Sequence, residues 1–250
     1  MRQLRLLAVA GLGAFLLTAT AMLPARIVLP AIGVPAAVAS DVRGTIWHGA
    51  AGRVSLGGLA LGPVNWQALP ARLLLGQLAA DVEAKLPDGF ANGRVDVAPG
   101  GRITLADFAA AAPLSWLSPG AALAGGQLTA RLETLAISSG RVAAAVGSVE
   151  LAGVVLPIPT AGPQLGPGTY TVTFAAANLG ADQPLTGELK DNGGPLEIAG
   201  TVKITPPGSY EVSGTAKPRP GAPPELLNAL QMLGPATPDG GHVLSLAGSF

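Results

Sequence analysis

Histidine and cysteine side chains carry much of the chemistry that proteins do near neutral pH, and this sequence offers few of them. Its two histidines, His48 and His242, stand almost 200 residues apart in glycine-rich surroundings, and neither belongs to a metal-binding or acid–base motif. Cysteine is absent, which excludes thiol catalysis and metal–thiolate sites. We therefore expect His48 to be an ordinary surface histidine at a turn.

Carboxylates and glycine-rich loops give no stronger signal. Asp81 and Glu83, like Glu188 and Asp191, occur on predicted strands or turns, where charges normally face solvent. No serine lies in a G-x-S-x-G elbow, no Walker-type Gly-Lys-Ser or Gly-Lys-Thr occurs, and Gly11 and Gly13 lack the third glycine of a dinucleotide fingerprint. The sequence thus predicts a protein without catalytic residues, metal or cofactor.

The most informative segment is residues 6–23, an 18-residue run without a charge that follows Arg2 and Arg5. At helical rise it spans about 27 Å, close to the hydrocarbon thickness of a bilayer, so it predicts one transmembrane helix. The arginines favour a cytoplasmic N-terminus and send the rest of the chain to the periplasm of a bacterium. A cleaved signal peptide ending near residues 19–21 (Ala-Thr-Ala) is the alternative, and it also exports the remainder.

Composition predicts a β-rich fold. The 250 residues include 35 glycines and 23 prolines but only three Trp, two Tyr and five Phe, which is typical of many short elements. Fifteen basic and fifteen acidic side chains cancel, so no electrostatic footprint for nucleic acid is present.

A short unit recurs along the chain, in which glycine is followed by alternating apolar and polar residues. It occurs at residues 52–56, 93–97, 101–105, 140–142, 147–151 and 200–204. Alternation puts the apolar side chains on one face, and glycine relaxes φ at the turn before each strand. We predict an elongated, curved antiparallel sheet of about ten to fourteen short strands, each of roughly five residues.

Helix signals are few. Prolines at positions 24, 30 and 35 predict an extended lead-in over residues 24–40. One or two short helical turns are expected at residues 68–75 and 107–112, and the best helix is residues 223–233, which begins with proline and carries a leucine stripe.

Four segments are predicted from these signals: a cytoplasmic tip and anchor (1–26), a proline-rich lead-in (27–43), and two periplasmic β halves (44–152 and 168–250). The seam between the halves is the proline- and glycine-rich stretch 153–167, which interrupts any strand ladder.

Two tryptophans lie in distinctive contexts, residues 44–49 (GTIWHG) and 61–66 (LGPVNW), and residues 69–76 (LPARLLLG) follow. We expect the two indole rings to share one apolar layer. After a short basic N-terminus and an apolar helix, this order of segments resembles the type II secretion system protein N family. The positions that carry the resemblance are Gly44, Thr45, Trp47, Gly49, Trp66, Pro70, Leu73, Leu74 and Gly76.

The resemblance implies a non-catalytic accessory component of the bacterial inner membrane, with the bulk of the chain in the periplasm. Its partners would be inner-membrane platform proteins or the outer-membrane secretin, and no active-site residues come with it. An open sheet edge could recruit such partners by strand addition. The family's fold also looks similar to AsmA-type proteins, so the alternative is a periplasmic lipid-binding or lipid-transfer protein with an apolar β groove.

Overall fold

The computed structural model describes residues 11, 18, 21–31, 38–56, 59–117, 125–156, 165–180, 183–206, 208–222, 224–232 and 236–249. Most of the apolar run 6–23 is outside these residues. Among the helices that are described, none combines the length and apolar character needed to cross a membrane. The chain divides into two compact units, Met1–Leu86 and Pro87–Phe250, called unit 1 and unit 2 below.

Unit 1 is built from short elements. Its helices and strands are α2 (Ala25–Ala31), β1 (Ala39–Ser40), β2 (Arg43–Gly44), β3 (His48–Ala51), β4 (Arg53–Leu56), β5 (Leu59–Leu61), β6 (Val64–Ala68), α3 (Pro70–Leu73) and β7 (Leu78–Leu86). Strands β1, β4 and β5 form one antiparallel sheet, and β2, β3, β6 and β7 pair antiparallel in that order.

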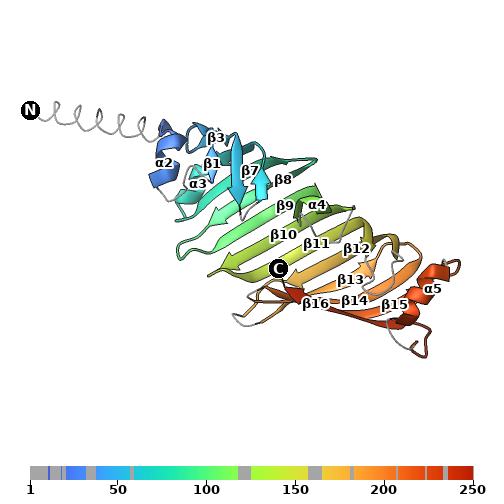
Figure 1. Cartoon of the computed structure of the whole chain (residues 1–250). Coiled ribbons are helices and arrows are strands. Elements are labelled where there is room, and N and C mark those ends of the chain that lie inside the picture. Colours follow the sequence, from blue (N-terminus) through green and yellow to red (C-terminus); the bar gives the residue numbers. More distant parts are fainter. Residues whose placement is uncertain are drawn as a thin grey trace, which may run out of the picture. The chain divides into compact units, whose positions relative to one another are not determined.

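Unit 2 is an antiparallel meander. Its elements are β8 (Gly89–Val97), β9 (Ile103–Pro113), α4 (Leu114–Leu117), β10 (Gln127–Ser138), β11 (Arg141–Leu156), β12 (Leu165–Ala176), β13 (Leu185–Asp191), β14 (Leu196–Thr205), β15 (Ser209–Pro218), α5 (Pro224–Met232) and β16 (His242–Ser249). Each strand from β8 to β16 pairs with the next one in sequence, so the strands lie side by side in chain order (Figure 1). The prediction of a mainly β, antiparallel fold with few short helices is confirmed.

The core of unit 2 forms on one face of this sheet. Along β13 burial alternates strictly, with Leu185, Gly187 and Leu189 buried and the polar residues between them exposed. The same alternation in β12 and β14 builds an apolar cluster of Leu114, Val154, Tyr170, Val172, Leu189, Leu196, Ile198, Ala216, Leu226 and Leu230. Alternation in the sequence therefore translates directly into a buried face and a solvated face.

Helix α5 closes this core, as its sequence predicts. Pro224 begins the helix, where its missing N–H has no partner to lose. Leu226 and Leu230, four residues apart, are buried on the face toward the sheet, whereas Leu227 is 40% exposed. Figure 1 shows α5 beside the strands at the β15 side of unit 2. Helix α3 likewise falls within the short helical segment expected at residues 68–75.

The expected helical turn at residues 107–112 is wrong. These residues belong to β9, where Ala109, Ala110 and Ala111 pair with β10 on one side and β8 on the other. Alanine favours helices, but two flanking strands satisfy its backbone groups and override that propensity. Asp107, with a φ of 50°, lies at an irregularity of the β8–β9 ladder and ends the regular alternation there.

The strands are longer than predicted, because glycine does not always mark a turn. Gly93, Gly147 and Gly200 lie inside β8, β11 and β14, and β11 alone runs for 16 residues. Gly147, at a φ of 136°, sits opposite a register shift in β10, which is the geometry of a β-bulge. Gly200 faces Gly214 across the β14–β15 pair, where a side chain on either would collide with the opposite backbone.

The lead-in is also not fully extended. Residues 25–31 form α2, which contains Pro30 at its last position but one. A proline this close to the helix end removes a single intrahelical bond, so the short helix survives. The predicted seam stays a prediction, since residues 157–164 lie outside the described part of the chain. The described residues on either side belong to β11 and β12, which pair with each other as far as Leu156 and Leu165.

Candidate functional site

The segment that carries the family resemblance forms a tight turn between β2 and β3 in unit 1. Gly44 has a φ of +82°, a conformation that glycine adopts without strain. The amide of Thr45 donates to the carbonyl of His48 at 2.8 Å, and the hydroxyl of Thr45 accepts from the amide of His48 at 3.1 Å. Gly44 and Thr45 thus fix the shape of the turn, which explains why these residue types occur here.

Trp66 packs over the end of this turn. It pairs with Gly49 across β6 and β3, and any side chain at Gly49 would collide with the indole. The indole Nε1 donates to the carbonyl of Ile46 at 3.2 Å. Trp47 lies in the turn and not in a strand, with its carbonyl accepting from the amide of Ala68 at 2.7 Å. Both indoles are half-buried, so their common apolar layer stays a prediction.

The remaining motif positions form the turn after β6. Pro70 begins α3, and Gly76, at a φ of +71°, closes the turn with its amide donating to the carbonyl of Leu73 at 2.9 Å. Four leucines here are exposed to solvent: Leu73, Leu74 and Leu75 in the turn and Leu78 at the start of β7. Leu74 is 89% exposed, which is unusual for a large apolar side chain in an ordered turn.

The residues that could do acid–base chemistry differ in their surroundings. His48 is exposed in unit 1, whereas His242 is buried at the start of β16 in unit 2. Asp81 and Glu83 lie on β7 in unit 1. Within the described ranges no three metal-ligating side chains cluster together. The sequence expectation for Glu188 is correct, because it is exposed and pairs with Lys190 at 2.7 Å on the solvated face of β13.

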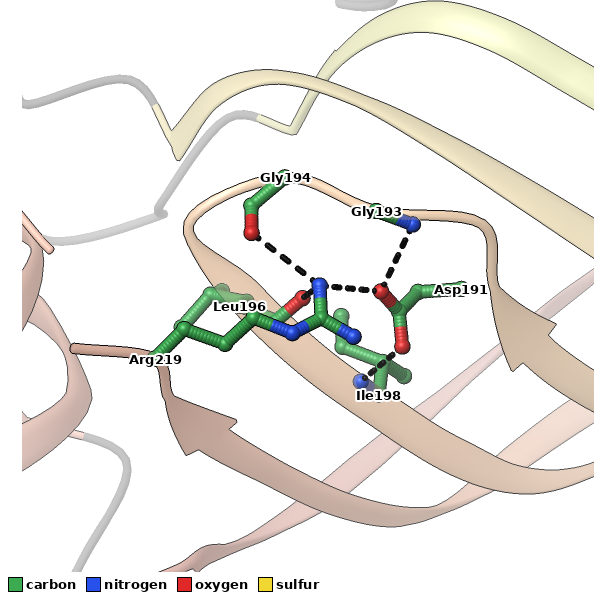
Figure 2. A network of polar contacts seen from close by, with 6 residues as sticks. All are labelled: Asp191, Gly193, Gly194, Leu196, Ile198 and Arg219. Carbon is green, nitrogen blue, oxygen red and sulfur yellow. Dashed lines mark hydrogen bonds and ion pairs between the residues drawn. The ribbon is translucent and has the colours of Figure 1, made fainter. Parts of the chain in front are cut away.

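Asp191 is the exception, because the expectation that it faces solvent is wrong. Its side chain is only 5% exposed, and its carboxylate pairs with the guanidinium of Arg219 at 2.7 Å. One carboxylate oxygen also accepts from the amide of Gly193 at 3.1 Å and the other from the amide of Ile198 at 3.0 Å. Figure 2 shows this network at the turn between β13 and β14.

Arg219 completes the network from the end of β15. Its Nη1 donates to the carbonyls of Gly194 and Leu196 at 3.0 and 3.1 Å (Figure 2). Burial raises the pKa of Asp191, but the Arg219 hydrogen bond, the two amide donors and the charge of Arg219 outweigh it and hold the pKa below its usual value of 3.8. The carboxylate is therefore ionised near neutral pH and ties three strand ends together.

This network has a signal in the sequence. Residues 191–194 read Asp-Asn-Gly-Gly, and an Asp at this position commonly caps the amide two residues later. The partner was not predictable, because Arg219 lies 28 positions along the chain and no local pattern joins it to Asp191. The arrangement is structural, because three of the roughly four acceptor positions of the carboxylate are filled by groups of the protein itself.

Strand β16 is the outermost strand of unit 2. It pairs with β15, and no second neighbour occurs among the described strands of this unit. Its sequence, residues 242–249 (HVLSLAGS), has neither proline nor a lysine, arginine, aspartate or glutamate. Val243 and Leu246 are more than half exposed. Edge strands in proteins are commonly protected by charge, proline or a bulge, so β16 is suited to accept a further strand.

Comparisons with known proteins identify the family of this chain. The model of the family "Type II secretion system (T2SS), protein N" matches residues 35–245, which cover both units, and the chain belongs to this family. A type II secretion system protein N from Vibrio cholerae serotype O1 is 39% identical over 61 residues. That alignment spans 24% of this chain and 24% of the relative. No solved structure matches the chain.

Proposed function

We propose that the chain is an accessory, non-catalytic component of the type II secretion system, held in the inner membrane by residues 6–23 with both units in the periplasm. Its membership of the protein N family over residues 35–245 carries this proposal. The contacts of the Asp191 carboxylate with groups of the protein itself support a non-catalytic role. In this proposal the turns at residues 44–49 and 69–76 of unit 1 have a structural role.

Its mechanism is recruitment of a partner strand by β16. An added strand would satisfy the outward-facing backbone groups of residues 242–249, while Val243 and Leu246, which lie on opposite faces of the strand, would each contact the partner on one face of the sheet. A platform or secretin component is the proposed partner, because the apparatus brings such proteins beside the inner membrane.

A deletion strain tests the role, and two variants test the mechanism. We expect loss of secretion of the exported enzymes in the deletion strain, restored by the wild-type gene but not by Val243→Lys with Ser245→Lys, two exposed positions on the same face of β16. Lysine on an edge strand opposes pairing because its charge must be buried. Thr173→Lys is the control, since Thr173 is exposed on the interior strand β12. Normal secretion without the gene would refute the role in secretion. Full rescue by the double variant would refute strand addition at β16 as the mechanism.

A second candidate function is lipid binding on the apolar face of unit 2. The observation that favours it is a continuous row of apolar and small residues across five strands: Phe174, Gly187, Val202, Val212 and Leu246. Gly187 makes room beside the Phe174 ring, so the row alternates large and small groups. Such a surface suits acyl chains, in the manner of the AsmA-type proteins.

Native mass spectrometry separates the two functions. The full chain, purified in detergent and released in the gas phase, should carry no phospholipid if it is a scaffold. Stoichiometric phospholipid that is lost in Val212→Lys, a change in the middle of the row, would favour lipid binding instead. Thr215→Lys, on the opposite face of β15, is the matched control.

A further inference from the structure

Four exposed leucines, from the end of α3 to the start of β7, are explained neither by strand addition nor by the apolar face of unit 2. We call Leu73, Leu74, Leu75 and Leu78 the leucine lip. We propose that the leucine lip inserts into the surface of a lipid bilayer and gives unit 1 a membrane contact of its own.

The lip is held outward by an ordered turn. The amides of Leu74, Leu75 and Gly76 donate to the carbonyls of Ala71, Arg72 and Leu73 at 3.3, 3.0 and 2.9 Å. The amide of Gln77 donates to the carbonyl of Arg72 at 3.1 Å, and Arg72 Nη1 reaches Gln77 Oε1 at 3.5 Å. A turn with its backbone groups satisfied keeps the leucines exposed, instead of letting them fold back onto the sheet.

With residues 6–23 as the proposed membrane anchor, the path of the chain favours the bilayer as the occupant. The apolar run 6–23 ends at Leu23, whose carbonyl accepts from the amide of Ile46 at 3.0 Å. The carbonyl of Ile46 in turn accepts from Trp66, and the next residue, Trp47, binds Ala68 just before α3. A few hydrogen-bonded steps thus connect the end of a membrane-length segment to the base of the lip.

Charge points the same way. Arg72 is the single charged residue between positions 69 and 80, and it is directly followed by the leucines. A cation beside exposed leucines matches an anionic lipid surface, where the arginine stays among the headgroups while leucines sink about 5 to 10 Å below them. Figure 1 places α2 and α3 in the same part of unit 1, and α2 adds the exposed Ile27.

The absence of cysteine makes the test direct, because a single introduced cysteine can be labelled uniquely. Full-length Leu74→Cys, labelled with an environment-sensitive fluorophore, is reconstituted into vesicles of phosphatidylethanolamine and phosphatidylglycerol. The control is Lys85→Cys, an exposed position on β7 about 23 Å along the strand from Leu78. We expect the Leu74 label to shift to the blue and to be quenched by nitroxide-bearing lipids, and the Lys85 label to stay in water and be quenched by iodide.

Either of two results with the labelled chain in vesicles would overturn the proposal: iodide quenching at both positions, or a blue shift at Leu74 without quenching by nitroxide lipids. The second result would mean that a protein, such as a second copy, covers the lip. A further variant, Leu73→Ser with Leu75→Ser, should reduce nitroxide quenching at position 74, and unchanged quenching would also count against the lip. The proposal takes its inner-membrane setting from the proposed function, but it needs no role in secretion. Quenching at Leu74 together with normal secretion in the deletion strain would therefore refute the function alone.

Discussion

Unit 1 and unit 2 differ in the size of the apolar side chains that they bury. Among the described residues of unit 1, the buried hydrophobic side chains are all alanines: Ala25, Ala51, Ala79 and Ala84. Unit 2 buries leucine, isoleucine, valine and tyrosine in one cluster. Unit 1 meanwhile leaves Leu74, Leu75 and Leu78 at 60% exposure or more. Because burial of large side chains supplies most of the free energy of folding, unit 2 carries its own stability.

The comparison shows how one part of a β protein can supply folding stability while another part leaves apolar side chains exposed for binding. Long strands of seven to twelve or more residues let unit 2 repeat its alternation often enough to build a core. Strands of two to five residues in most of unit 1 cannot do so, and hydrogen-bonded turns around Gly44 and Gly76 organise it instead. The large leucines of unit 1 are therefore left at its surface.

The largest expected effect comes from the core of unit 2. Leu230 is 1% exposed on α5, and Leu230→Ala should reduce the free energy of unfolding by about 2 to 5 kcal/mol, since it removes buried methyl groups and leaves a cavity. Leu227→Ala, on the same helix at 40% exposure, should cost less than about 1 kcal/mol. Urea titrations followed by circular dichroism measure both. Equal losses for the two variants would contradict the assignment of the core to the face of α5 that carries Leu230.

How much of this the sequence could predict depends on how local the signal is. Alternation predicted the antiparallel sheet and its buried face, and the proline-led leucine stripe predicted α5. The alanines of residues 107–112 misled, because alanine is helical only until strands flank it on both sides. Gly93, Gly147 and Gly200 misled for a related reason: whether a glycine ends a strand or lies opposite another backbone depends on a partner strand far away in sequence.

The next effect concerns the polar network of unit 2. Asp191→Asn removes the charge that meets Arg219, and we expect a loss of about 1.5 to 3 kcal/mol, the range for a hydrogen bond to a charged group. Arg219 is 34% exposed and regains some hydration, which keeps the loss below that of a fully buried pair. Glu188→Gln, which breaks the exposed contact with Lys190, should change stability by less than about 1 kcal/mol. A similar loss in both variants would mean that the network adds nothing beyond a surface ion pair.

The same variant has a pH signature. The pKa of Asp191 is lowered in the folded chain, so the unfolded chain binds this proton more readily. Its contribution to stability is complete above the unfolded pKa, near 3.8, and is lost as pH falls through the folded value. The difference between wild type and Asp191→Asn should therefore be constant near neutral pH and shrink below about pH 4. A constant difference down to pH 2 would show that the lost charge is not its cause.

The candidate site was predictable where its residues are close in sequence. Residues 44–49 and 69–76 stood out as motifs, and each forms one turn. Their connection to one another through Trp66 and Ala68 follows from the pairing of β3 with β6, which skips β4 and β5. No pattern in the sequence predicts that β3 pairs with β6 in place of β4, and none predicts that Arg219 contacts Asp191.

The smallest effect sharpens the account of unit 1. Trp66→Phe keeps a ring over Gly49 but removes the donor to the Ile46 carbonyl, so we expect a loss of about 0.5 to 1.5 kcal/mol, seen as faster amide exchange at residues 45–49. Full truncation of a buried Trp typically costs about 3 to 5 kcal/mol. Trp66→Phe should cost less, because Trp66 is only half-buried and the variant retains an aromatic ring. His48→Ala, exposed in the same turn, should stay within about 0.5 kcal/mol, because its backbone makes the hydrogen bonds to Thr45. If His48→Ala kept the fold but abolished secretion, the histidine would have a role in binding, and unit 1 would be more than a scaffold for its leucines.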